Sequence, residues 1–268
     1  MKNKLEQVNG ITRVMDVVAR LRGEDGCPWD RQQTLDSLKP CLMEECCELL
    51  EAIEQGDVAA HRDELGDVLL QVVMQARIRE EQGDFDFEAV AGHLADKLIR
   101  RHPHVFGDAK ADTTAEVMQH WARIKQEERG GADAPPQATL DGIPLQLPAL
   151  HRAQRIQERA GKKGFDWDRI DDVIDKVEEE LEEVREALKA DDADAVEGEL
   201  GDLLFATVNL CRFRGVHAEG ALRRAIAKFT SRFHAVERRL LAAGRRLEDC
   251  TLAEMDREWD RVKADEAS

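Results

Sequence analysis

Hydrophobic positions in this chain recur every three or four residues, which is the spacing of one face of an α-helix. Two such faces are formed by Leu42, Leu49, Leu50 and Ile53 in the first half and by Val173, Val177, Leu181, Val184 and Leu188 in the second. No stretch shows sustained alternation of apolar and polar residues bounded by hairpin turns, so strands are not expected. The pattern therefore predicts an all-α fold.

Loops interrupt the helical pattern at two matching places. Gly56-Asp57 ends the first helical stretch, and residues 191–194 end the later one. An aspartate at each break can cap the next helix, because its carboxylate accepts hydrogen bonds from free backbone N–H groups. Each short loop is expected to fold the second helix back against the first. Four residues of the helix after Asp57 are too apolar to face water, namely Val68, Leu69, Val72 and Val73.

One acidic pattern occurs twice in the chain at the same internal spacing. Its form is E-E-x-x-E, followed 16 positions after its last Glu by E-L-G-D. The spaced carboxylates are Glu45, Glu48, Glu64 and Asp67 in the first copy and Glu180, Glu183, Glu199 and Asp202 in the second. A single shift of 135 residues relates all four pairs. This regularity indicates an internal duplication.

Further blocks of sequence repeat on either side of the acidic pattern. Residues 26–30 resemble 164–168, residues 97–101 resemble 228–232, and residues 115–125 resemble 253–263. Between the copies, four of the seven prolines fall between residues 135 and 148, which marks a linker extended by its prolines. We predict domains at 1–129 and 149–268, separated by a linker at 130–148. Each domain is expected to hold about four or five helices.

Composition and charge narrow the class of protein. The chain has 268 residues, 42% hydrophobic and 35% charged, with a net charge of −17. Such an acidic surface repels the backbone of DNA or RNA, but it allows a small anionic substrate if divalent cations are bound. The six cysteines contain no C-x-x-C pair, residues 1–9 are polar and charged, and the apolar stretches are too short to cross a bilayer. These features predict a cytoplasmic protein that contacts neither nucleic acid polymers nor membranes.

The acidic pattern is suited to binding a cation. Carboxylates three or four positions apart on a helix point the same way, and a cluster from two antiparallel helices needs a counter-ion. Oxygen ligands suit Mg²⁺, or Mn²⁺ as a substitute, whereas the Glu-x-x-His of helical di-iron sites has no counterpart here. The predicted metal ligands are the eight spaced carboxylates of the two copies. The alternative is a solvated, glutamate-rich helix face.

A glycine precedes the last aspartate of each acidic pattern. Gly66 and Gly201 lie inside apolar helices, where Gly costs roughly 1 kcal/mol relative to Ala. A close approach of the partner helix would explain this cost, so we expect one at both glycines.

Cationic and aromatic residues are candidates for binding a phosphorylated nucleotide. Lys228 and Arg232 lie four apart on one helical face and can contact a triphosphate, unless they are solvated surface residues. Lys176, one turn before Glu180, can neutralise the cluster or touch a phosphate, unless it only forms an ion pair along the helix. Trp259 can stack on a base or pack between helices.

Together these motifs resemble the MazG family of nucleoside triphosphate pyrophosphohydrolases over nearly the whole chain. The markers are C-P-W-D at 27–30, the acidic pattern in both copies, R-H-P-H-V-F at 101–106 and K-K-G-F-D-W at 162–167. The resemblance implies an all-α, Mg²⁺-dependent fold that dimerises through its helices and hydrolyses nucleoside triphosphates between the α and β phosphates. It also implies phosphate contacts at Lys228 and Arg232, with Trp259 at the nucleotide site. The first copy departs from this pattern, because Cys41 stands where the second has Lys176, so catalysis is expected in the second copy.

The hypothesis for the mechanism uses the second copy. Two or more Mg²⁺ ions held by its four carboxylates bind the triphosphate and activate a water that attacks the α-phosphorus. The predicted catalytic residues are Lys176, Lys228 and Arg232 as cations and Glu179 as candidate general base. The predicted nucleotide-binding residues are Lys176, Glu179, Glu180, Lys228, Arg232 and Trp259.

Two other interpretations stay open at this point. In the first, the chain is a non-catalytic, dimeric interaction or regulatory protein that holds structural Mg²⁺. In the second, it is a hydrolase with a narrower substrate, such as dUTP or a damaged nucleotide. Recognition of the nucleobase depends on the shape of a pocket rather than on the acidic motif, so the sequence does not show which nucleobase is preferred.

Overall fold

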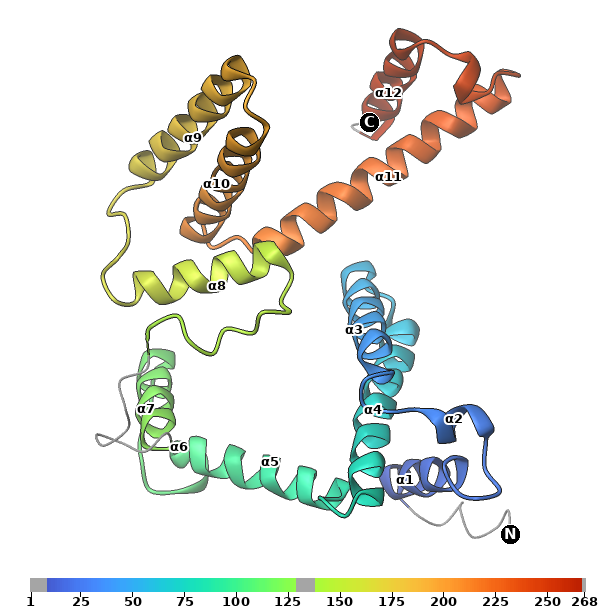
Figure 1. Cartoon of the computed structure of the whole chain (residues 1–268), viewed down its shortest axis with the longest axis vertical. Coiled ribbons are helices and arrows are strands. Elements are labelled where there is room, and N and C mark those ends of the chain that lie inside the picture. The colour runs from blue at the N-terminus through green and yellow to red at the C-terminus, as the bar shows by residue number, and fades with distance from the viewer. Residues whose placement is uncertain (1–8, 129–137, 267–268) are drawn as a thin grey trace. The chain divides into compact units, whose positions relative to one another are not determined.

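The computed structural model of the protein describes residues 9–128 and 138–266. The chain forms two compact units, Met1–Ala134 and Pro135–Ser268. Every regular element within the described ranges is helical, with twelve α-helices and one 3-10 turn at Leu247–Asp249 (Figure 1). The predicted all-α fold is confirmed.

The first unit is built around a pair of antiparallel helices. Its helices are α1 (Gly10–Leu21), α2 (Pro28–Gln32), α3 (Leu38–Gln55), α4 (Val58–Glu81), α5 (Phe87–Arg101), α6 (Pro103–Phe106) and α7 (Thr114–Glu127). α3 packs along α4, α1 packs on α4, and α7 packs on α5. The core between α1, α3 and α4 consists of Val18, Leu38, Val73, Met74 and Ile78.

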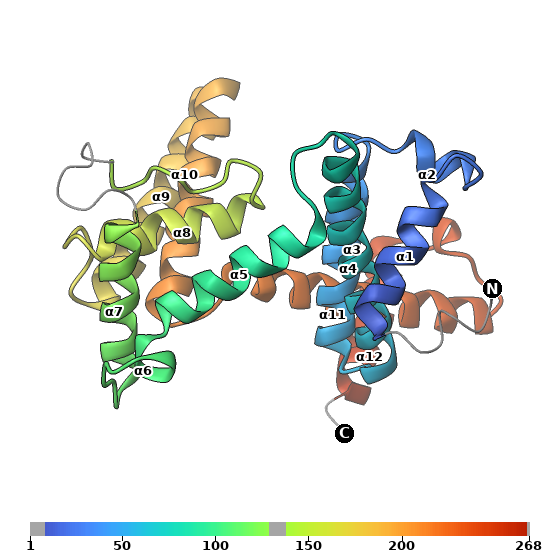
Figure 2. The same ribbon diagram turned by 90° about the horizontal axis from the view of Figure 1, so that it is seen from below.

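The second unit repeats this order of packing. Its helices are α8 (Ala149–Gly161), α9 (Ile170–Ala190), α10 (Ala193–Phe213), α11 (Ala218–Ala242) and α12 (Leu252–Glu266). α9 packs along α10, α8 packs on α10 and α11, and α12 packs on α11. Figures 1 and 2 both show α12 lying against α11 and away from the α9–α10 pair. The repeated order of helices agrees with the predicted duplication.

Aspartate caps start the second helix of each pair, as predicted. The Asp57 carboxylate accepts hydrogen bonds from the backbone N–H groups of Ala59 and Ala60, and Asp192 caps α10 in the same way. The preceding residues, Gly56 and Asp191, adopt positive φ angles of 71° and 54° that turn the chain between the two helices. These turns bring each acidic helix pair together.

Two expectations differ from the structure, namely the number of helices in the first unit and the burial of Val72. The first unit has seven helices within residues 9–128, because the short helices α2 and α6 begin at Pro28 and Pro103, where the fixed φ of proline favours a first helical turn. Val72, which was expected to be buried, is 39% exposed in the single chain. The predicted linker lies partly outside the described residues, and its part from 138 to 148 contains turns at 139–142 and 145–146.

The turns before α8 are joined to that helix by a hydrogen bond. Arg159 of α8 donates a hydrogen bond to the carbonyl of Asp141, and Ile143 is buried. The exact domain boundaries and the cytoplasmic location stay predictions. In the described part of the chain, no helix is long and apolar enough to span a membrane.

Candidate metal and nucleotide site

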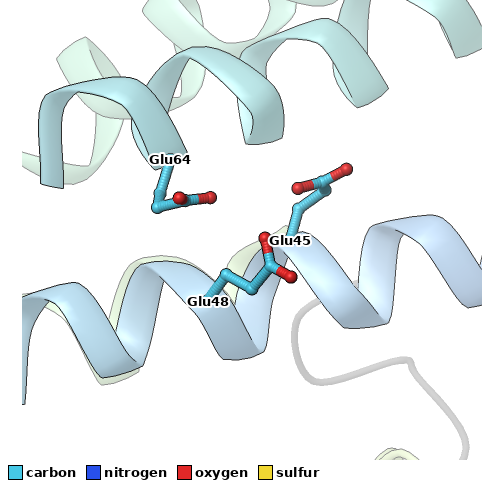
Figure 3. Close-up of side chains that lie close together, drawn as sticks. All are labelled: Glu45, Glu48 and Glu64. Atoms are coloured by element: carbon cyan, nitrogen blue, oxygen red, sulfur yellow. The ribbon is translucent and has the colours of Figure 1, made fainter. Parts of the chain in front are cut away.

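The α3–α4 pair brings carboxylates of the first copy together. Glu45 and Glu48 lie one turn apart on α3, and Glu64 faces them from α4 (Figure 3). One carboxylate oxygen of each residue lies within 4.8 Å of the others. Asp67, the fourth predicted ligand, is outside this close group, but its charge still acts on Glu45.

Burial and mutual repulsion both act on this first cluster. Burial raises the pKa of the Glu45 carboxyl, and the charges of Asp67 and Glu48 raise it further. Burial also raises the pKa of Glu64, with Glu48 as the next cause. The Oε2 atom of Glu64 is buried and has no hydrogen-bond partner among the described residues. A bound cation would relieve the repulsion between the carboxylates, and this oxygen could serve as one of its ligands.

The α9–α10 pair forms the equivalent cluster in the second copy. Glu180 of α9 and Glu199 and Asp202 of α10 each place one oxygen within 4.8 Å of the others. Glu180 is only 6% exposed. Glu183 is outside the close group, and its pKa is raised first by burial and then by the charge of Glu180. In each copy, three of the four predicted ligands therefore lie together, and the fourth lies within electrostatic range.

Lys176 supplies a cation to the second cluster. Its Nζ lies 2.7 Å from Glu180 and 2.9 Å from Glu179. These contacts, the one with Glu180 first, raise the pKa of Lys176 well above its usual range. The ion pair along the helix is therefore present. Glu179, the candidate general base, is paired to this lysine, and its side chain is 57% exposed.

The first cluster has a neutral amide beside it, from a position that is not equivalent to Lys176. Gln71 of α4 is 6% exposed, and its side chain lowers the pKa of Glu45, against the larger upward effect of burial. Its Oε1 atom has no hydrogen-bond partner in the described parts of the chain. The shift of 135 residues pairs Gln71 with Ala206 and Cys41 with Lys176. Sequence reasoning missed Gln71, although a polar residue within an apolar stretch was a usable signal.

The expected close helix approach at the two glycines is wrong for the single chain. A Cβ atom added to Gly66 or Gly201 would meet nothing within 4 Å. Neither glycine is therefore required by packing against the facing helix. Both positions leave open space next to the last aspartate of each acidic pattern.

Arg232 of α11 and Trp259 of α12 lie together in the second unit. The Arg232 Cζ is 6.0 Å from the centre of the indole ring. Glu266, the last residue of α12, accepts hydrogen bonds from Nε and Nη2 of Arg232 at 2.9 and 2.6 Å. This contact holds the pKa of Glu266 below its usual range, and the charge of Lys228 adds to the effect. Phe229 packs on the same indole, with ring centres 5.1 Å apart.

The first unit contains the same arrangement. The Arg101 Cζ is 5.3 Å from the centre of the Trp121 ring, and Arg101 Nη2 lies 2.6 Å from Glu128. Arg100 bonds to the same carboxylate. Sequence reasoning found the arginine and tryptophan pairs but missed the glutamates. The available signal was that Glu128 and Glu266 are separated by the same 138 residues as the two tryptophans.

Within one chain, the predicted nucleotide residues lie in two places. Lys176, Glu179 and Glu180 belong to α9, whereas Lys228, Arg232 and Trp259 belong to the α11–α12 pair. Figure 1 shows α12 apart from the α9–α10 pair. The described contacts of Arg232 are with Glu266 and Trp259. A single chain therefore does not bring the two sets of residues together.

The residues present fit a divalent cation. All ligand atoms of both close groups are carboxylate oxygens, the type that Mg²⁺ and Mn²⁺ prefer. The buried, unpartnered oxygen of Glu64 adds a specific need for a cation in the first copy. In the second copy, the single ammonium group of Lys176 faces a close group of three carboxylates, so a divalent cation can offset the remaining repulsion.

Comparisons with known proteins cover both acidic helix pairs. The family model of the MazG nucleotide pyrophosphohydrolase domain matches residues 33–106 and 170–236. The chain is 47% identical over 262 residues to the nucleoside triphosphate pyrophosphohydrolase of Escherichia coli K12, covering 97% of this chain and 99% of that protein. It is 44% identical over 250 residues to the nucleoside triphosphate pyrophosphohydrolase/pyrophosphatase MazG of Thermotoga maritima, covering 93% and 94%.

Duplicated acidic helix pairs in an all-α chain, together with these similarities, define the class as nucleotide pyrophosphohydrolase. The chain belongs to the MazG family. The resemblance and the enzyme class predicted from the motifs are confirmed. Family membership favours an enzyme over a non-catalytic interaction protein.

Proposed function

We propose that the protein hydrolyses nucleoside triphosphates, ribose or deoxyribose, to the monophosphate and pyrophosphate by attack of water at the α-phosphorus. The observation that carries this proposal is the cluster of three carboxylates, from Glu180, Glu199 and Asp202, next to the ammonium group of Lys176. The names of the Escherichia coli and Thermotoga maritima relatives support this substrate class.

A divalent cation completes the carboxylate cluster of the second unit. Glu180, Glu199 and Asp202 are the proposed ligands, Glu183 is the fourth, and Mg²⁺ is the proposed ion, with Mn²⁺ as a substitute. When bound, the cation supplies positive charge to the triphosphate and lowers the pKa of a bound water.

The side chains around the cluster have separate roles in this proposal. Lys176 holds the buried carboxylate of Glu180 in place and offsets its charge, so that an anionic substrate can approach. Glu179 is exposed and accepts the proton of the attacking water. Lys228 and Arg232 contact the phosphates that leave as pyrophosphate. Trp259 lies next to Arg232 and contacts the nucleoside.

A homodimer is part of the proposal, because one chain separates the carboxylate cluster from the α11–α12 pair. The α11–α12 pair of one copy would then complete the site of the other. Large apolar side chains of the second unit are exposed in the single chain, among them Ile174 and Leu181 of α9, Leu204 and Phe205 of α10, and Phe229 of α11. Burying apolar surface contributes about 25 cal/mol per Å², which favours association of two copies.

The first unit is proposed to bind a cation without catalysing hydrolysis. Its cluster has Cys41 in place of Lys176 and the neutral Gln71 beside Glu45. It therefore offers ligands to a metal ion but has no ammonium group at the position of Lys176. We place the non-catalytic domain at 1–129 and the catalytic domain at 149–268.

Product analysis tests the reaction. The purified chain is incubated with each NTP and dNTP in the presence of Mg²⁺, and the products are separated by chromatography. Monophosphate and pyrophosphate are expected. Diphosphate and phosphate would mean that a different phosphorus is attacked. The absence of turnover with both Mg²⁺ and Mn²⁺ would favour the alternative that the protein is not catalytic.

Matched variants test which unit is catalytic. Asp202→Ala removes a proposed ligand in the second unit and is expected to abolish turnover, whereas the equivalent Asp67→Ala is expected to retain it. Circular dichroism of both variants checks that the helices are intact. Loss of turnover in Asp67→Ala with retention in Asp202→Ala would assign catalysis to the first unit.

A further inference from the structure

Each unit holds an arginine between a tryptophan ring and a glutamate, and in the second unit this arginine belongs to the proposed phosphate site. Glu266 bonds to Nε and Nη2 of Arg232, which together form one edge of the guanidinium group. A guanidinium has five N–H donors in a planar fork. Its Nη1 group and the second N–H of Nη2 form another edge, which is shaped to receive two oxygens of a phosphate.

The surroundings of Arg232 restrict its orientation. Its side chain is 20% exposed, and Glu266 is held at the end of α12. The ring of Trp259 flanks the guanidinium and packs against the core of Val236, Leu240 and Val262. The two partners therefore belong to a helix that is packed on α11. An arginine fixed in this way loses less conformational freedom when a phosphate binds.

We propose that Glu266 is a positioning residue of the phosphate site. It bonds to one edge of Arg232 and so presents the other edge to the triphosphate. This inference rests on the proposed function, because that function assigns Arg232 to the phosphates. Glu266 does not touch the substrate itself.

The first unit offers a natural comparison. Glu128 bonds to both Arg100 and Arg101, whereas the position equivalent to Arg100 in the second unit is Ser231. Arg232 therefore has no arginine before it in the chain to share its glutamate, as Arg101 has in Arg100. Glu128→Gln is therefore the matched control, because it removes an ion pair of the same type from the unit that is proposed not to catalyse hydrolysis.

The experiment compares Glu266→Gln with Glu128→Gln in the full chain. Both variants lose an ion pair to an arginine of another part of the unit, so both are expected to lower the Tm by a few degrees. Only Glu266→Gln is expected to raise the KM for ATP with Mg²⁺, by about three- to tenfold, because a charge-assisted contact that orients Arg232 is weakened. The kcat is expected to change less than the KM.

Binding of inorganic pyrophosphate gives a readout that does not depend on turnover. Calorimetry with pyrophosphate and Mg²⁺ is expected to show weaker binding for Glu266→Gln and unchanged binding for Glu128→Gln. A lower KM or tighter pyrophosphate binding in Glu266→Gln would mean that Glu266 competes with phosphate, which overturns the proposal. Unchanged values, or equal losses in both variants, would also overturn it.

The products of the wild-type enzyme test the proposed function separately. If they are not monophosphate and pyrophosphate, the proposed function fails, whatever the variants show. If they are, and Glu266→Gln binds pyrophosphate as the wild type does, only the positioning role fails.

Discussion

Glu128 shows how one ion pair links stability to pH. Hydrogen bonds from Arg101, and then from Arg100, lower its pKa from 4.5 to about 2. A carboxyl whose pKa falls on folding stabilises the native state above its unfolded pKa and loses that effect as the pH falls through the folded value. We expect Glu128→Gln to lower the Tm at pH 7, with a difference from wild type that shrinks between pH 4.5 and about pH 2.

Thermal melts of both proteins across this pH range measure the effect. Because protonated Glu128 carries no charge, it should resemble the glutamine at the acidic end of the range. A Tm difference that stays constant over the whole range would show that Glu128 acts through packing and not through its charge.

Lys176 is the single residue that most clearly separates the two clusters. Its Nζ contacts both Glu179 and Glu180, and Cys41 takes its place in the first unit. We expect Lys176→Ala to lower kcat/KM by about tenfold or more, since it removes a cation from the proposed substrate site. Cys41→Ala is the control at the equivalent position and should leave kcat/KM unchanged. Steady-state kinetics with ATP compare the two, and equal effects would contradict the assignment of catalysis to the second unit.

At the scale of helices, the caps fix where the second helix of each acidic pair begins. The Asp57 carboxylate takes up two backbone N–H groups of α4, and Asp192 does the same for α10. We expect Asp57→Ala and Asp192→Ala each to lower the free energy of unfolding by about 1 kcal/mol. Urea titrations followed by circular dichroism measure this change. Asparagine caps nearly as well as aspartate, so the Asn variants should stay close to wild type.

The sequence predicts the helix pairs well because their determinants are local. Apolar spacing defines the faces of α3 and α9, and the capping aspartates, Asp57 and Asp192, mark where α4 and α10 begin. These signals act within a few residues of the helix that they define. The short helices α2 and α6 are not predicted, because four or five residues are too few to show an apolar period.

The candidate site is predicted less completely, because its parts depend on long-range packing. Helical spacing predicts that Glu45 and Glu48 share a face, but it does not determine which residue of α4 reaches them. Only the fold shows that Glu64 joins the close group and that Asp67 lies outside it. The ion pair between Arg232 and Glu266 joins two helices across 34 positions, so no local pattern predicts it.

At the scale of the whole molecule, the two units share one order of helix packing and differ in side chains at their carboxylate clusters. Both keep three clustered carboxylates and an arginine flanked by a tryptophan and a glutamate. Only the second has Lys176 at the carboxylate cluster, where the first has Cys41. Family membership covers both units, so the difference lies in individual side chains and not in the fold.

The proposed dimer leads to a prediction about the complete enzyme. Leu204 of α10 is 58% exposed in the single chain, and the proposed interface would cover it. A charge buried there without a partner opposes association. We therefore expect Leu204→Glu to shift the protein from dimer to monomer in sedimentation velocity and to reduce turnover, while circular dichroism shows the helices unchanged.

Leu145 provides the matched control, because it is 76% exposed and lies in the turns before α8 rather than on the proposed interface. Leu145→Glu should remain dimeric and active. If Leu204→Glu weakens the dimer without abolishing it, its activity per chain should rise with protein concentration, because mass action restores the pairing. A wild-type protein that is monomeric and fully active would show that one chain contains a complete site, and the α11–α12 residues would then need a different role.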